Sequence, residues 1–292
     1  MQRIAAAFCR ERQAGNDPVY LDMSQIPETK RDYYFHSMVK WMDLFLTKLD
    51  SRARIDMFGK TPYYPLNQMT KMAIRTTPDC RSSVQGLLAA GLAQAGCATH
   101  FAGFHIGLCI GNGWIAGRSA AEDAAAVAPS DIDEQVAAEH GERALARLLT
   151  GSTADSDTLL RRVQQLMFRY DVNVLKRADR LDAALGELTE LRASADELRA
   201  PDAHELVRIH ELAAMLQGAE IILQASAVRQ ESRLSHIRED FPDRDDQDWL
   251  RWVLVSDSGG MRFETEPIAT PLVPLQASND SKQKARAHFG SH

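Results

Sequence analysis

The hydrophobic and polar positions divide the chain into a first half of short, mixed elements and a second half of long helices. In the second half, apolar residues recur every three or four positions, which is the spacing of an amphipathic helix. Pro201 separates the last two of these stretches, so we expect an antiparallel helical bundle. Helices are predicted over residues 1–13, 28–49, 159–167, 181–191 and 206–228.

Strand patterns are shorter and lie between or after these helices. A run of small and apolar residues ahead of Gly91 is suited to a buried strand that ends in a glycine turn. Near the C-terminus, two β-rich stretches flank Asp257-Ser258-Gly259-Gly260, which is a hairpin signal. Strands are predicted over residues 19–23, 72–76, 84–91, 249–255 and 261–266, with a solvated tail over 279–292.

The high glycine content of residues 96–117 requires a physical explanation. This stretch holds six glycines, and each glycine in a helix costs about 1 kcal/mol relative to alanine. Glycines at this density allow the backbone to approach either a ligand or another structural element closely. The alanine-rich segment 119–127 that follows is predicted to be helical.

Composition and charge narrow the class of function. The net charge of −6 and the isoelectric point of about 5.9 provide no general positive field for nucleic acid. The four cysteines form no C-x-x-C pair, and His100 and His105 are five positions apart, so a metal or iron–sulfur centre is disfavoured. No apolar stretch is long enough for a signal peptide or a membrane span, which favours a cytoplasmic protein.

The most informative motif follows the last predicted helix. Residues 229–246 read R-Q-E-S-R-L-S-H-I-R-E-D-F-P-D-R-D-D and are followed by Trp249. This run resembles the E-S-R-x-x-H-x-R-E-D-[FY]-P-x-R-D-D motif of the flavoprotein subunit in the succinate dehydrogenase, fumarate reductase and adenylylsulfate reductase superfamily. Residues 83–117 and 18–22 resemble, respectively, the end of that family's flavin-binding domain and the end of its capping domain.

The resemblance implies a mostly helical α+β fold. It would consist of a remnant of an α/β FAD-binding domain, an antiparallel helical bundle and a C-terminal β-hairpin. The implied segments are the end of a capping-like part, the C-terminal half of the FAD-binding domain, a helical domain, the hairpin and a flexible tail. Their expected bounds are 1–50, 51–128, 129–246, 247–276 and 277–292.

The family's N-terminal signatures have no counterpart in this sequence. Family chains open with a strand and a G-x-G-x-x-G turn that places the FAD pyrophosphate on a helix N-terminus, and no such motif lies upstream of Pro18. The family segments that supply the catalytic arginine would also lie before Met1. We therefore expect a truncated or split flavoprotein, or one that has lost the ancestral chemistry, and we assign no catalytic residue.

The resemblance also implies where FAD would be held. A helix leading to Gly117 would direct its positive N-terminal end at the flavin's pyrimidine edge. Leu92 stands where the family usually has an acid for the ribityl hydroxyls, and Gln68 stands where its dicarboxylate reductases have histidine, so succinate or fumarate is disfavoured as substrate. The expected FAD-binding residues are Ala90, Gly91, Gln94, His100, Gly103, His105 and Gly107. The alternative is that the glycines only permit tight helix–sheet packing and that the histidines are structural.

The mixed-charge run after the last helix has two interpretations. Such runs are usually solvated, whereas the resemblance implies an ordered salt-bridge network that pins the helical domain to the flavin domain or to a partner. We expect a structural clamp without direct catalysis. Its members would be Arg233, His236, Arg238, Glu239, Asp240, Arg244, Asp245 and Asp246.

Two hypotheses for function follow. In the preferred one, the chain is the C-terminal portion of an FAD-dependent oxidoreductase and is inactive without an N-terminal FAD-binding half. Its partners would be an iron–sulfur subunit or a chain that carries that half, and a partner could hold it at a membrane surface. In the alternative, the chain is a non-catalytic helical interaction module that kept the family's scaffold, which the departures at Leu92 and Gln68 support.

Overall fold

A computed structural model describes residues 2–30, 59–62, 73–94, 104–126, 133–152, 155–257 and 259–268 of the chain. The chain divides into two compact units, Met1–Leu66 and Asn67–His292. Most of the predicted helix over 28–49 and all of the predicted tail lie outside the described residues.

The first unit pairs a helix with a short sheet. α1 (Gln2–Gln13) buries Phe8 and Cys9. β1 (Tyr20–Asp22) pairs in antiparallel register with β2 (Lys60–Pro62). The predictions of a first helix and of a first strand after Pro18 are therefore confirmed.

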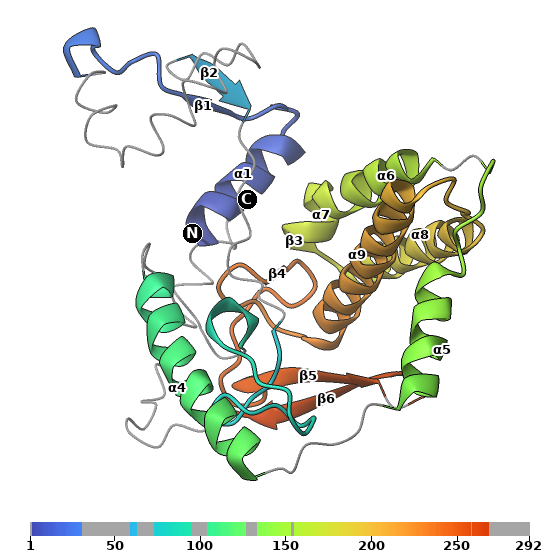
Figure 1. Ribbon diagram of the computed structural model, residues 1–292. Helices are drawn as coiled ribbons and strands as arrows, with labels where there is room; N and C mark the ends of the chain where they lie inside the picture. The colour runs from blue at the N-terminus through green and yellow to red at the C-terminus, as the bar shows by residue number, and fades with distance from the viewer. Residues whose placement is uncertain are drawn as a thin grey trace. The chain divides into compact units, whose positions relative to one another are not determined.

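The helical bundle forms the main core of the second unit. α6 (Ser156–Phe168), α8 (Ala178–Asp196) and α9 (Ala203–Val228) pack against one another (Figure 1). Asp155 and Asp202 cap α6 and α9, because each carboxylate accepts the backbone N–H three residues further on. Leucines at helical spacing fill the interior, as the periodicity predicted: Leu159, Leu166, Leu181, Leu188, Leu191, Leu212, Leu216 and Leu223.

Shorter elements attach to this bundle. α5 (Glu134–Leu145) has no buried residue and contacts the bundle where His210 Nε2 lies 2.9 Å from the carbonyl oxygen of Ala144. α7 (Tyr170–Asn173) leads into β3 (Leu175–Lys176). β3 pairs in parallel with β4 (Ile237–Arg238), so the chain after α9 returns to the start of α8.

The predicted C-terminal hairpin is confirmed. β5 (Arg251–Asp257) and β6 (Met261–Pro267) pair antiparallel, with Arg251 opposite Pro267 and Asp257 opposite Met261. Gly259 and Gly260 adopt positive φ angles of 81° and 136°, which non-glycine residues rarely accept. The glycine pair therefore permits the reversal that the sequence indicated.

Two strand predictions in the first half are wrong. Residues 84–91 form a turn and not a buried strand, because Gly86 has a φ of 80° and an antiparallel bridge between Arg81 and Leu88 closes a tight loop. Val84 and Leu87 of this loop are exposed. In the described part of the predicted strand 72–76, only Ile74 makes a β-bridge, in parallel with Gln94.

The glycine-rich stretch is largely helical. α4 (Phe104–Ala126), labelled in Figure 1, begins well before the alanine-rich segment in which a helix was predicted. It is preceded by the single 3₁₀ turn η1 (Gly91–Ala93), which it contacts. In the part of the chain that the structure describes, no helix has the length and apolar character required to cross a membrane.

Candidate functional site

The turn at Gly91 fits closely against α4. Gly91 is buried with a φ of 62°, and a Cβ built on it would lie 2.8 Å from Cys109 Sγ. Only glycine satisfies both the backbone conformation and the space at this position. Close approach to α4 therefore explains the glycine at position 91.

Gln94 joins the same turn to α4 through its side-chain amide. Its Nε2 donates to Thr76 Oγ1 at 2.7 Å, and its Oε1 accepts from Asn112 Nδ2. Both ends of the amide are thus hydrogen-bonded within the chain. Ala90, which precedes η1, is half-buried beside them.

The C-terminal part of α4 is held to the same segment by a charged contact. Arg81 donates to both carboxylate oxygens of Asp123 at 2.9–3.1 Å and ion-pairs with Glu122 at 3.2 Å. This guanidinium lowers the pKa of Asp123. Ser119 Oγ donates to the carbonyl oxygen of Asp79 at 2.8 Å. These hydrogen bonds and ion pairs therefore hold segment 73–94 against one side of α4.

The other expected FAD-binding residues lie at or before the start of α4. Gly107 is exposed, and nothing lies within 4 Å of a Cβ built on it. His105 is in the first turn, but its side chain is outside the described residues, as are His100 and Gly103. The first backbone N–H groups of a helix lack intrahelical partners and carry partial positive charge. The open backbone at Gly107 and this helix end offer space and partial positive charge, whereas Gly91 is closed by Cys109.

The mixed-charge run forms the ordered network that was expected, around a residue that was not named for it. Glu231 is fully buried and its carboxylate contacts Arg229 at 2.5 Å and Arg233 at 2.7 Å. It also accepts the backbone N–H of Asp245 at 2.9 Å. Arg233 continues the network to Asp246 at 2.8 Å. Glu231 is the glutamate of the E-S-R part of the motif. Nothing in the sequence indicated that its carboxylate would be buried.

Arg238 is the second centre of the network. Its guanidinium is 1% exposed and binds both oxygens of Asp240 at 2.7 Å. Its Nη1 donates to the carbonyl oxygens of Ser226, Ala227 and Arg229, at the end of α9, at 2.8–3.1 Å. Asp240 in turn accepts the backbone N–H of Ala178, the first residue of α8, at 3.0 Å. The arginine therefore ties the loop after α9 to the ends of two bundle helices.

The network also reaches the hairpin. Arg229 Nη1 donates to the carbonyl oxygen of Trp249 at 3.0 Å, and its Nη2 donates to that of Arg251. Among the described residues, the contacts of the network lie within the bundle and the hairpin. Segment 73–94 instead meets the hairpin through the ion pair between Arg75 and Glu266, at 2.6 Å.

His236 lies among cations at the centre of this network. Burial and the neighbouring Lys176, Arg229 and Arg238 lower the pKa of His236 to about 3, although its ring nitrogen lies 3.2 Å from the carbonyl oxygen of Arg229. The imidazole is therefore neutral at physiological pH. Protonation would place a further positive charge beside three others.

This arrangement predicts a loss of stability in mild acid. The unfolded histidine, with a pKa near 6.5, binds a proton that the folded His236 excludes until about pH 3. The free energy of unfolding should therefore fall as the pH drops below about 6.5, by about 2 kcal/mol between pH 7 and pH 5. Urea denaturation at both pH values measures this, and His236→Asn should remove most of the difference. An equal pH dependence in the variant would refute the assignment.

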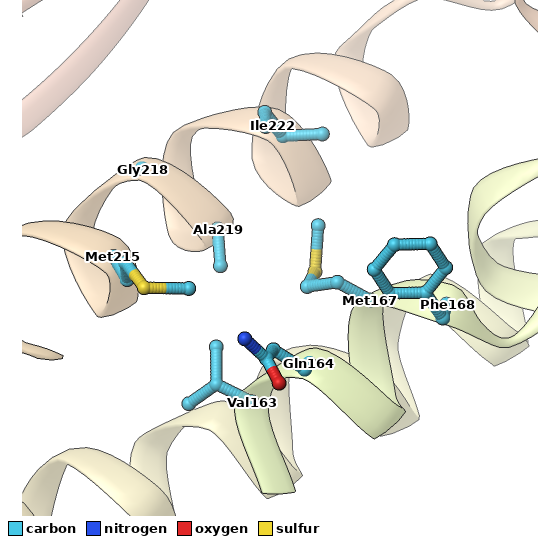
Figure 2. Close-up of a pocket in the computed structure, with 8 residues that line it drawn as sticks. All are labelled: Val163, Gln164, Met167, Phe168, Met215, Gly218, Ala219 and Ile222. Atoms are coloured by element: carbon cyan, nitrogen blue, oxygen red, sulfur yellow. The ribbon is translucent and has the colours of Figure 1, made fainter. Parts of the chain in front are cut away.

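A shallow apolar groove lies between α6 and α9 (Figure 2). Of its lining side chains, only that of Gln164 is polar. The lining residues are Val163, Gln164, Met167, Phe168, Met215, Gly218, Ala219 and Ile222. The groove offers no titratable or nucleophilic group, so it is not a candidate for chemistry.

Comparison with known proteins agrees with this architecture. Residues 160–282 match the family model described as the fumarate reductase flavoprotein C-terminus. The succinate dehydrogenase flavoprotein subunit of Rickettsia conorii is 27% identical over 216 residues, which are 70% of this chain and 36% of that protein. An uncharacterized FAD-dependent oxidoreductase of Methanocaldococcus jannaschii is 25% identical over 259 residues, 86% of this chain and 46% of that one.

Solved structures extend the likeness to most of the fold. E. coli quinol fumarate reductase superposes with a TM-score of 0.78 over 94% of this chain and 50% of its own, at 22% sequence identity. This chain thus spans about a third to a half of the length of the relatives it matches. Over residues 160–282 the chain is similar to the C-terminal part of the fumarate reductase flavoprotein, and its fold resembles that of quinol fumarate reductase.

Proposed function

We propose that this chain is the C-terminal part of an FAD-dependent oxidoreductase and supplies one wall of its flavin site. The observation that carries the proposal is the shared fold with quinol fumarate reductase over 94% of the chain. A match over 94% of the chain extends well beyond the helical bundle. A helical interaction module alone would not need segment 73–94 and α4, so it is the less favoured function.

The wall consists of the Gly91 turn, η1 and the N-terminal half of α4. FAD bound there would supply hydride transfer, and the chain's own residues would position it. The N-terminal end of α4 would favour negative charge on the flavin ring, and the open backbone at Gly107 would allow close approach. Gln94, whose amide is bonded to Thr76 and Asn112, would fix the turn and would not bind FAD directly. Ala90 and Gly91 would contribute backbone only.

The proposed partners follow from the same assignment. The flavin pyrophosphate would be held by the N-terminal, FAD-binding portion that relatives carry. The electrons would pass to an iron–sulfur subunit, and the assembly would work in the cytoplasm, with or without attachment to a membrane through that subunit. The bundle and its charge network would then support the part of the chain that lines the flavin site.

Leu92 offers a direct test of the flavin wall. It is 56% exposed in η1, where the family resemblance places an acid that bonds the ribityl hydroxyls. We define the reconstituted pair as this chain co-expressed with the part of the Rickettsia conorii flavoprotein that it does not match. In this pair, Leu92→Glu should add a charge-assisted hydrogen bond of about 1.5 kcal/mol and tighten FAD binding about tenfold.

The control and the readout are simple. Leu145→Glu, at a leucine of α5 that is 57% exposed, changes the charge equally and should leave FAD affinity unchanged. Flavin fluorescence titration of the reconstituted pair measures both variants. Equal FAD affinities for Leu92→Glu and Leu145→Glu would show that η1 does not face the ribityl chain.

A further inference from the structure

We propose that the groove between α6 and α9 is a site of methionine oxidation by hydrogen peroxide, and that Met215 is the residue oxidised first. The groove has no acid, base or catalytic nucleophile, so it performs no chemistry of its own. It does hold two thioether sulfurs, those of Met167 on α6 and Met215 on α9. This modification site is independent of the flavin assignment, because α6 and α9 alone form it.

Hydrogen peroxide can reach both sulfurs from solvent. The groove is open at the surface and has a volume of about 260 Å³, which leaves room for a molecule only slightly larger than water. Figure 2 shows the side chains of Met167 and Met215 directed into this space from opposite helices. The two sulfurs therefore differ from atoms of a close-packed core, which packing shields from an oxidant.

Burial distinguishes the two methionines. Met215 is 39% exposed. Met167 is half-buried and packs against the leucine-rich core of the bundle. The sulfoxide that forms is polar, so placing it against that core costs more at Met167 than at the more exposed Met215. Met215 should therefore react first.

The oxidation balances with peroxide as the only co-reactant. A lone pair on Sδ of Met215 attacks one oxygen of hydrogen peroxide, so that an S–O bond forms and the O–O bond breaks. The sulfur loses two electrons, which reduce the peroxide. The proton of the transferred hydroxyl group passes to the departing hydroxide, which leaves as water. The product is methionine sulfoxide, a polar side chain in place of an apolar one.

The new oxygen should loosen the contact between α6 and α9. Among the described side chains that line the groove, only that of Gln164 can donate a hydrogen bond to it. Figure 2 shows the amide of Gln164 directed into the groove. Any further donor must be water, which then enters between apolar residues such as Val163 and Ile222. Oxidation should therefore lower the stability of the bundle.

Peptide mapping of the full chain after peroxide treatment tests the site. In the folded chain, Met215 should gain one oxygen about tenfold faster than Met167, whereas in urea the two rates should be equal. Mapping also separates this event from oxidation of the exposed thiol of Cys109. Equal rates in the folded chain, a faster Met167, or a preference for Met215 that persists in urea would overturn the proposal.

Leucine variants test the effect on the bundle, because leucine has nearly the volume of methionine and does not react with peroxide. Peroxide should lower the midpoint of thermal unfolding of the wild-type chain by a few degrees more than that of Met215→Leu. Met261→Leu, on β6 of the hairpin, is the matched control and should lose as much as the wild type. Circular dichroism measures all three. An equal decrease in Met215→Leu and wild type would overturn the proposed loosening of α6 from α9.

Discussion

Replacing Glu231 with alanine should lower the free energy of unfolding by about 3–5 kcal/mol, the usual cost of removing one partner from a buried ion pair. The carboxylate is fully buried and joins Arg229 and Arg233. Its loss leaves two largely buried guanidinium groups without their shared counter-ion. It also leaves the backbone N–H of Asp245 without its acceptor.

Urea denaturation followed by circular dichroism measures this effect. Glu264→Ala, at an exposed position of β6, is the matched control and should change stability by less than about 0.5 kcal/mol. Glu231→Gln keeps the shape of the side chain and serves if the alanine variant does not fold. A stability of Glu231→Gln equal to that of the wild type would contradict the role assigned to this carboxylate.

Replacing Arg238 with alanine should lower the free energy of unfolding by about 3 kcal/mol. The loss includes both contacts to Asp240 and the donors to the carbonyl oxygens at the end of α9. The cost falls at the lower end of the range for buried pairs, because the side chain of Asp240 is 23% exposed and can be rehydrated.

The shape of the guanidinium should matter as much as its charge. Arg238→Lys keeps the charge but cannot bind both oxygens of Asp240 and the carbonyl groups at once, so it should recover less than half of the lost stability. Arg262→Ala, at an exposed arginine of β6, is the control and should be nearly neutral. Full recovery by lysine would mean that the network needs only a positive charge at this position.

The bundle and the hairpin could be predicted from the sequence because local pattern and final packing agree there. Leucines such as Leu188 and Leu216 recur at helical spacing and are buried in the bundle core. Gly259 and Gly260 predicted the hairpin turn from the sequence, and in the structure they adopt the positive φ angles of that turn. In the bundle, the apolar residues that recur at helical spacing in the sequence are the same residues that are buried in the core.

Segment 73–94 and α4 were harder to predict, because their local preferences conflict with their structure. The glycines of α4 disfavour a helix, yet the helix forms, held by contacts such as Arg81 with Asp123 and Asn112 with Gln94. These contacts join residues far apart in the sequence, and periodicity does not report them. The run before Gly91 is apolar like a strand, but Gly86 turns the chain back before a strand can extend.

The candidate site was predicted in part. The motif over 229–246 indicated the charge network but not that Glu231 and Arg238 are its buried centres. Of the expected FAD-binding residues, the structure joins Gly91 and Gln94 to α4, the helix that carries Gly107. Burial and partner choice depend on the whole fold, so the sequence indicated a charge network but not the buried roles of its members. The assignment of these residues to a flavin site stays a prediction.

The flavin content of the reconstituted pair tests the central claim most directly. Its visible absorbance, recorded after size-exclusion chromatography, should show bound flavin that comigrates with both polypeptides at one FAD per pair. A folded, intact pair that stays colourless after incubation with excess FAD would contradict the claim that this chain forms a wall of a flavin site.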